Sequence, residues 1–204
     1  MQKIDIKKTL KHLYNPPNGR FTVVDVPPMN FLMVDGHGDP NKTPAFQENT
    51  EALYTLAYTI KFALKPAGVE FVVPPLEGLW WMEDMREFSL AVKDCWDWTL
   101  MMMQPKAVTP EILANARQQA LRKKALPALE KVRLEAYHEG LSVQIMYYGS
   151  YADEGPTIAR MHAFIRDEGS VPNGKHHEIY LGDPRRTPPE KLKTVIRQPV
   201  RKAG

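Results

Sequence analysis

The spacing of apolar and polar residues predicts an α+β chain in which short strands alternate with a few helices. Between Pro44 and Leu64 apolar residues recur every three or four positions, which indicates a helix with proline in its first turn. A second helix is expected from the N-cap residue Thr109 to about Lys124. The other predicted segments are a short basic helix at 3–14, strands at 21–26, 30–36, 69–73, 79–82, 95–103, 141–149, 175–181 and 194–199, a helix at 156–168 and a helical turn at 188–193, while 126–139 has no clear assignment.

The predicted elements fall into two halves with the same order, strand-helix-strand-strand. Each last strand ends in Gln-Pro, at Gln104 and Gln198, and each first strand ends in glycine, at Gly36 and Gly149. One half alone cannot bury a sheet face, so we expect two antiparallel modules with pseudo-twofold symmetry and helices around a central cleft. The expected parts are an N-terminal appendage at 1–19 and a domain at 20–204, which consists of half one at about 30–105, a connecting helix at 109–124 and half two at about 141–201.

Composition and charge are those of an ordinary globular protein. Hydrophobic residues make up 43% and charged residues 25% of the chain, which excludes a disordered or fibrous protein. There is no apolar run long enough for a membrane span and no apolar stretch typical of a secretory signal. The single cysteine, Cys95, cannot form an intrachain disulfide, so we expect a cytoplasmic protein. A net charge of +3 is too small to indicate a nucleic-acid partner.

Three segments carry a distinctive sequence: Pro75 to Trp81 (PLEGLWW), Trp98 to Pro105 (WTLMMMQP) and His176 to Pro199, which opens with HHEIYLGDPRR. They resemble the stand-alone GyrI-like small-molecule-binding proteins, and the resemblance covers roughly residues 20–201. It implies two strand-helix-strand-strand modules around a central cleft, a fold that also serves as the effector-binding domain of multidrug-responsive transcription regulators. The 19 leading residues are too few for a helix-turn-helix domain, so the resemblance is to the free-standing branch.

Some members of that branch hydrolyse cyclopropane-bearing DNA alkylators with two cleft glutamates and an aromatic lining. The resemblance places the two catalytic glutamates at Glu154 and Glu178. On a strand, Glu178 lies opposite the apolar Ile179 and Leu181, so it faces either open solvent or a cleft in which burial would raise its pKa toward a useful acid-base value. Glu154 precedes a predicted helix, where a carboxylate is also favoured by the helix dipole alone.

Aromatic residues on or beside the predicted strands are candidates for the ligand-binding wall. A tryptophan-rich stripe is also typical of a plain core, so this assignment stays open. Trp80 and Trp81 are consecutive and therefore face opposite sides of a strand, as do Tyr147 and Tyr148, so one of each pair can line the cleft. The complete set of predicted ligand-binding residues is Trp80, Trp81, Trp98, Tyr58, Tyr147, Tyr148, Tyr180 and His176.

The expected function is binding of planar, apolar small molecules such as xenobiotics and drugs, with hydrolysis of electrophilic ones. The alternatives are a protein that binds or sequesters an effector without catalysis, and a protective protein that contacts a topoisomerase. No cofactor and no metal are expected, because the sequence lacks His-x₃-His, Cys-x₂-Cys and a phosphate-binding glycine loop. The expected partner is a small-molecule ligand, and no nucleic-acid or membrane partner is expected. Whether the protein forms a homodimer is left open.

Overall fold

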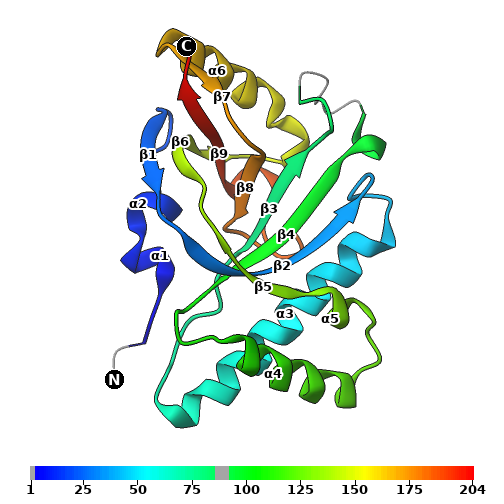
Figure 1. The fold of residues 1–204 in the computed structure, drawn as a ribbon. Helices are drawn as coiled ribbons and strands as arrows, with labels where there is room; N and C mark the ends of the chain where they lie inside the picture. Colours follow the sequence, from blue (N-terminus) through cyan, green and yellow to red (C-terminus); the bar gives the residue numbers. More distant parts are fainter. Residues whose placement is uncertain (1–2, 86–91) are drawn as a thin grey trace.

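The computed structural model describes residues 3–85 and 92–204, which form a twisted antiparallel sheet flanked by helices (Figure 1). Eight strands follow the order β1-β6-β9-β8-β3-β4-β2-β5, and β7 pairs with β9. The strands are β1 (Thr22–Val26), β2 (Met29–His37), β3 (Leu76–Trp81), β4 (Asp97–Gln104), β5 (Arg133–Tyr137), β6 (Gly140–Tyr148), β7 (Ser170–Pro172), β8 (His176–Tyr180) and β9 (Lys193–Lys202). The helices are α1 (Ile6–Thr9), α2 (Lys11–Tyr14), α3 (Pro44–Leu64), α4 (Pro110–Lys123), α5 (Ala128–Lys131) and α6 (Gly155–Asp167), with 3₁₀ turns η1 (Lys65–Ala67), η2 (Lys93–Cys95), η3 (Tyr151–Asp153) and η4 (Pro189–Lys191).

The sheet contains the predicted duplication. The first half runs β2-α3-β3-β4 and the second β6-α6-β8-β9, and in both the last strand lies between the other two. The halves join where β3 pairs with β8, antiparallel and in the middle of the sheet. The predicted α+β fold with two related modules is therefore confirmed.

The segment that precedes each half in the sequence supplies an edge strand to the other half. Strand β1 leads into β2 but pairs with β6, whereas β5 leads into β6 but pairs with β2. This exchange extends the pseudo-twofold relation to the two outer strands. It covers the outer edges of β6 and β2, so that β1 and β5 form the two ends of the sheet order.

Several short segments differ from the sequence-based prediction. Residues 69–73 do not form a strand and contribute only a single bridge between Phe71 and Ile4. Cys95 ends a 3₁₀ turn, so β4 begins at Asp97 instead of 95. Strands β5 and β7 are not predicted from the sequence, because both are short strands at edges whose pairing comes from distant segments.

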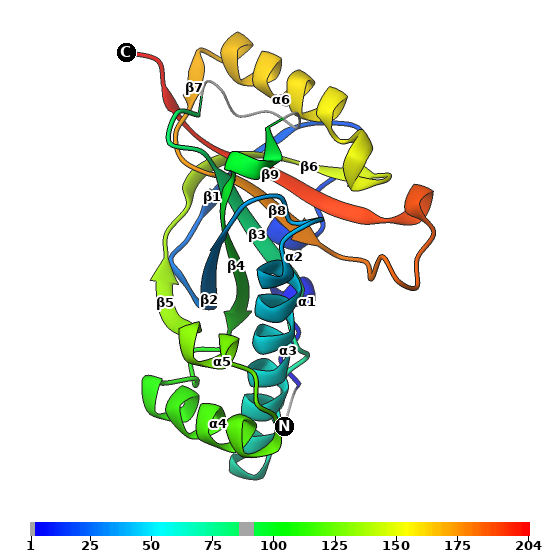
Figure 2. The same ribbon diagram turned by 90° about the vertical axis from the view of Figure 1, so that its right-hand side faces the viewer.

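Helices α3 and α6 cover the same face of the sheet, one over each half (Figure 2). Helix α3 packs with Trp80 in one apolar cluster, and α6 packs with Ile196 in another. On β8, His176 lies opposite Trp80 of β3, and Glu178 lies opposite Ile196 of β9. Because His176 and Glu178 are two positions apart on one strand, all four side chains lie on the same face of the sheet. No described helix is long and apolar enough to cross a membrane.

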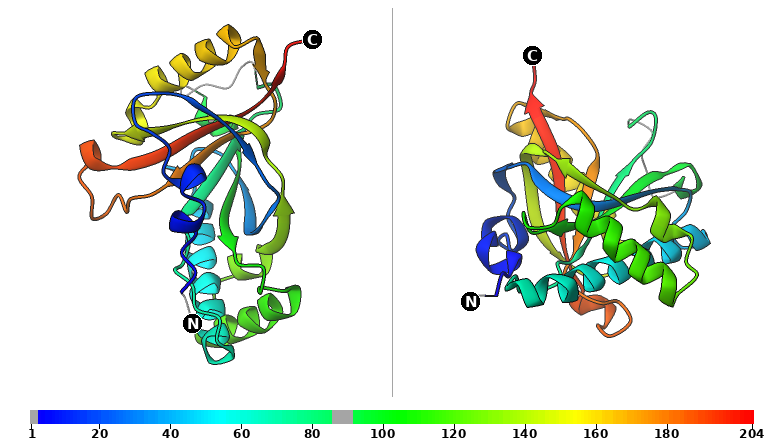
Figure 3. Two further views of the ribbon diagram at one scale, coloured as in Figure 1. Left: turned by 90° about the vertical axis from the view of Figure 1, so that its left-hand side faces the viewer. Right: turned by 60° about the horizontal axis from the view of Figure 1, so that its bottom comes forward.

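Residues 3–19 cover the opposite face, where α1 and α2 lie against the strands (Figure 3). Leu13 and Tyr14 are almost fully buried there, in an apolar cluster with residues of β6, β8 and β9. The backbone of Ile4 bonds to the segment around Phe71 on both sides, which fixes the start of the chain. This N-terminal segment thus contributes to the core of the sheet.

A buried network of charged side chains connects α2 with the sheet. His177 Nδ1 lies 2.9 Å from Glu139 Oε1, and its Nε2 lies 3.0 Å from Glu77 Oε2. Tyr14 donates a hydrogen bond to Glu77 at 2.8 Å, and Arg197 donates one to Glu139 at 2.9 Å. The four ionisable side chains of His177, Glu77, Glu139 and Arg197 are no more than 2% exposed, so their charges must remain balanced.

The stability of the fold is expected to decrease at alkaline pH because His177 is a buried cation. Burial alone would lower the pKa of His177, but Glu139 and then Glu77 raise it from 6.5 to about 9. The stabilisation is fully present below pH 6.5 and is lost as the pH rises through 9, a change of about 3 kcal/mol in the free energy of unfolding.

Urea denaturation between pH 6 and pH 10 measures this effect. His177→Gln removes the titrating group and should abolish the decrease, while His138→Gln, at an exposed position, should retain it. An equally steep decrease in His177→Gln would show that another group is responsible.

Candidate functional site

The two predicted glutamates come together on the face that α3 and α6 share. Glu178 lies in the middle of β8, between Gly78 on β3 and Ile196 on β9. Its side chain is 15% exposed, so a ligand or water can reach it. Glu154 immediately precedes α6 and is buried at 2% exposure. Each carboxyl group changes the pKa of the other, so the fold makes them one electrostatic unit.

The two carboxyl groups differ in ionisation. Burial, and next the Glu178 carboxylate, raise the pKa of Glu154 to about 10. Burial also acts to raise the pKa of Glu178, but hydrogen bonds with His176 and Tyr180 lower it below its ordinary value. Because adjacent carboxyl groups do not both ionise readily, the pair carries one proton at neutral pH, on Glu154.

One oxygen of this pair, Oε1 of Glu154, is buried without a hydrogen-bond partner in the described part of the chain. An unpaired buried polar atom costs about 1–3 kcal/mol, so a bound molecule that pairs with it is favoured. As a carboxylic acid, Glu154 can donate its proton to that molecule.

Tyr180 lies beside the pair, and the buried ring of Trp80, which is 3% exposed, packs against it. The Tyr180 hydroxyl donates to Glu178 Oε2 at 2.7 Å and accepts from Trp80 Nε1 at 3.2 Å. The indole lies over Gly78 of the same strand, where a Cβ atom would lie 2.8 Å from Trp80 Nε1, so the absence of a side chain at Gly78 leaves room for it. Burial, and then the charge of Glu178, raise the pKa of Tyr180 well above its ordinary value, so the phenol remains a donor.

Two further tyrosines, Tyr151 and Tyr147, interact with the pair, and Tyr54 interacts with Tyr151. The ring of Tyr151, in η3, lies edge-on to Tyr180 with centroids 5.3 Å apart, and burial followed by the charges of Glu154 and Glu178 raises the pKa of Tyr151 to about 12. Burial, and then Glu154, also raise the pKa of Tyr147. Tyr54 of α3 interacts electrostatically with Tyr151 and is 36% exposed, which places it toward the solvent side of the site.

Four of the predicted aromatic ligand-binding residues lie away from the pair. Trp98 is fully buried beneath α3, where its Nε1 donates to a backbone carbonyl at 3.1 Å, so it belongs to the core. Trp81 faces the opposite side of β3, with the ammonium of Lys175 3.3 Å from its ring centre. Tyr148 and Tyr58 are 43% and 46% exposed, and neither has a described contact with either glutamate.

Two histidines extend the site toward α6. His176 is buried, and its Nε2 lies 3.3 Å from Glu178 Oε1. An ionised carboxylate can only accept, so this nitrogen carries the proton. Burial, and then His176, lower the pKa of His162 on α6, which places the two imidazoles near each other.

Sequence reasoning did not identify His162 or Tyr151 as site residues. Tyr151 has a usable signal, because it lies three residues before Glu154 in the same turn. His162 has none, since it is one polar residue on an amphipathic helix.

The site offers acid-base chemistry from its own side chains. It combines a neutral carboxylic acid at Glu154, an ionised carboxylate at Glu178 and the phenol of Tyr180, which donates to that carboxylate. This set can polarise an electrophile and activate a water molecule at the same place. Among the described residues no group of three or more His, Cys, Asp and Glu side chains is arranged to hold a metal ion.

Known proteins share both the sequence and the fold. A family model described as the GyrI-like small-molecule-binding domain matches residues 20–201. A structure of an uncharacterized conserved protein from Listeria innocua is 44% identical, with a TM-score of 0.91, and the match covers 98% of this chain and 100% of that one. No match was found among curated proteins.

Two further structures extend the comparison. A hydrolase from Listeria innocua is 42% identical, with a TM-score of 0.88, and the match again covers 98% of this chain and 100% of that one. The C-terminal domain of EcmrR is 11% identical, with a TM-score of 0.57, and the match covers 90% of this chain and 98% of that one. At that identity the likeness to EcmrR shows the fold alone.

Proposed function

Because the chain belongs to the GyrI-like small-molecule-binding family, we propose that it binds a planar, apolar small molecule against Glu154 and Glu178 and hydrolyses electrophilic members of that class. The observation that carries the proposal is the asymmetric carboxyl pair, in which the acid Glu154 has an unpaired oxygen beside the ionised Glu178. The partly exposed ring of Tyr180, supported by the buried Trp80, suits a flat ligand. The relative from Listeria innocua described as a hydrolase supports a catalytic role.

The proposed reaction on a cyclopropane-bearing electrophile adds water across one ring bond. Glu178 takes a proton from the attacking water as its oxygen bonds to a ring carbon. The electron pair of the breaking carbon–carbon bond moves into the conjugated acceptor of the substrate, which Glu154 protonates. The proton on Glu178 then returns to Glu154, so both carboxyl groups regain their starting states.

One experiment separates hydrolysis from simple sequestration. The protein is mixed with a cyclopropane-bearing alkylator in ¹⁸O-labelled water, and the product is analysed by mass spectrometry. Catalysis predicts multiple turnovers with one ¹⁸O atom in each product. Saturable quenching of tryptophan fluorescence without any product would instead show a protein that binds and sequesters its ligand.

His176 is expected to act as a positioning residue that keeps Glu178 ionised. His176→Leu removes the 3.3 Å contact to Glu178, so the pKa of that carboxyl should rise and the acidic limb of the pH–rate profile should move to higher pH. His176→Gln retains a hydrogen-bond donor and should restore most of the profile. A uniform loss of rate without a shift in the profile would contradict this role.

A further inference from the structure

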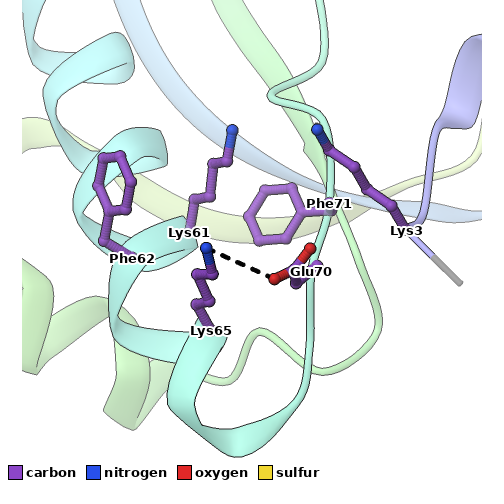
Figure 4. A pocket seen from close by; sticks show the side chains of 6 residues that line it. All are labelled: Lys3, Lys61, Phe62, Lys65, Glu70 and Phe71. Carbon is purple, nitrogen blue, oxygen red and sulfur yellow. Dashed lines mark ion pairs between the residues drawn. The ribbon is translucent and has the colours of Figure 1, made fainter. Parts of the chain in front are cut away.

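A cavity of about 190 Å³ lies at the C-terminal end of α3, apart from the glutamate pair (Figure 4). Its walls come from three segments: the start of the chain, the end of α3 with the following turn, and the stretch before β3. Six residues line it: Lys3, Lys61, Phe62, Lys65, Glu70 and Phe71.

The cavity has an excess of positive charge. Lys65 Nζ lies 3.6 Å from Glu70 Oε1, and this ion pair uses the single carboxylate among the lining residues. Lys3 and Lys61 have no carboxylate partner in the described part of the chain, and Figure 4 shows their ammonium groups on the two sides of Phe71. Two ammonium groups therefore remain to pair with an external anion.

The fold brings these lysines to one cavity from two separate segments of the chain. Lys61 and Lys65 are favoured near the end of α3 by the helix dipole alone. That effect does not explain Lys3, which comes from a different segment. Ile4 N donates to the carbonyl of Glu70 at 2.8 Å, and Val72 N donates to the carbonyl of Ile4 at 2.8 Å, so the backbone next to Lys3 is held beside the cavity.

Aromatic rings supply the remaining walls. Phe71 is 1% exposed and forms a buried part of the cavity wall, whereas Phe62 is 64% exposed. Phe62 stacks on Tyr58 with centroids 6.4 Å apart, and Lys61 Nζ lies 5.9 Å from the centre of the Phe62 ring. An exposed ring beside an ammonium group presents both an apolar face and a positive charge to one ligand.

We propose that this cavity is a second binding site, for a small aromatic anion such as an aryl phosphate or an aryl carboxylate. The anionic group pairs with Lys3 and Lys61, and the ring lies against the exposed ring of Phe62. The site uses none of the residues around Glu154 and Glu178, so this proposal can be tested independently of the proposed hydrolysis.

Calorimetric titration with phenyl phosphate, inorganic phosphate and phenol tests the proposal in a buffer without phosphate. Phenyl phosphate should bind most tightly, because it alone combines the charge with the ring. The double variant Lys3→Met/Lys61→Met should bind it about tenfold more weakly, whereas Lys123→Met, at an exposed position on α4, should leave the affinity unchanged.

Three outcomes would overturn the proposal: no saturable binding of phenyl phosphate, equal affinity in the double variant, or equal affinity for inorganic phosphate. All three lysine positions are at the surface or partly exposed, so the variants should fold, which a melting curve checks. Glu154→Gln should bind phenyl phosphate at this cavity as the wild type does, which separates this site from the glutamate pair.

Discussion

Replacing Glu178 with glutamine should lower the turnover of a cyclopropane-bearing substrate by about 10²–10⁴-fold, the usual contribution of general acid–base catalysis. Glutamine retains the shape of the side chain, and its oxygen can still accept the hydrogen bond from Tyr180, but it cannot take a proton from water. Ligand affinity should change little, because the lost interaction belongs mainly to the transition state. Single-turnover rates and fluorescence titrations measure the two effects separately.

Glu154→Gln should cause a loss of similar size for a different reason, since it removes the proton donor. The double variant should lose less than the product of the two single effects, because the carboxyl groups act as a pair. Glu190→Gln, on the exposed turn η4, is the matched control and should retain wild-type turnover. Wild-type rates in both folded single variants would refute the glutamate mechanism.

Replacing Arg197 with methionine should lower the free energy of unfolding by about 3–5 kcal/mol, because it leaves the buried carboxylates of Glu77 and Glu139 with His177 as their one remaining cation in this network. Arg197 donates to Glu139 at 2.9 Å, to Gln144 at 3.0 Å and to the carbonyl of Leu13 at 2.6 Å. His177 and Arg197 hold the pKa of Glu139 at about 2 against the effect of burial, which raises it. Methionine fills much of the space but satisfies none of these acceptors.

Thermal and urea denaturation measure the change, and Tm should fall by about 6–20 °C for a chain of this size. Arg201→Met, on the exposed end of β9, is the control and should change stability by less than about 0.5 kcal/mol. Adding Glu139→Gln to Arg197→Met should recover part of the loss, since it removes the excess negative charge of the network. A loss below about 1 kcal/mol in Arg197→Met would show that Arg197 is not needed for charge balance.

The repeat and most elements of its halves could be predicted from local sequence. Helix α3 has a proline in its first turn and apolar residues at helical spacing, and α4 begins at a threonine that caps it as expected. These signals depend on residues within a few positions of one another, so they need no knowledge of the fold. The placement of Glu178 on one face of a strand follows from the same local alternation.

The tertiary structure alone decided which strands pair and which side chains meet. The exchange of β1 and β5 between the halves leaves no local signal, because each strand pairs with a segment far away in the sequence. Trp80 and Trp98 look alike as residues on strands, yet only Trp80 contacts Tyr180, since Gly78 leaves space for its indole. The acid and base states of Glu154 and Glu178 likewise arise only when burial and neighbouring donors act on both, and these depend on contacts between distant parts of the chain.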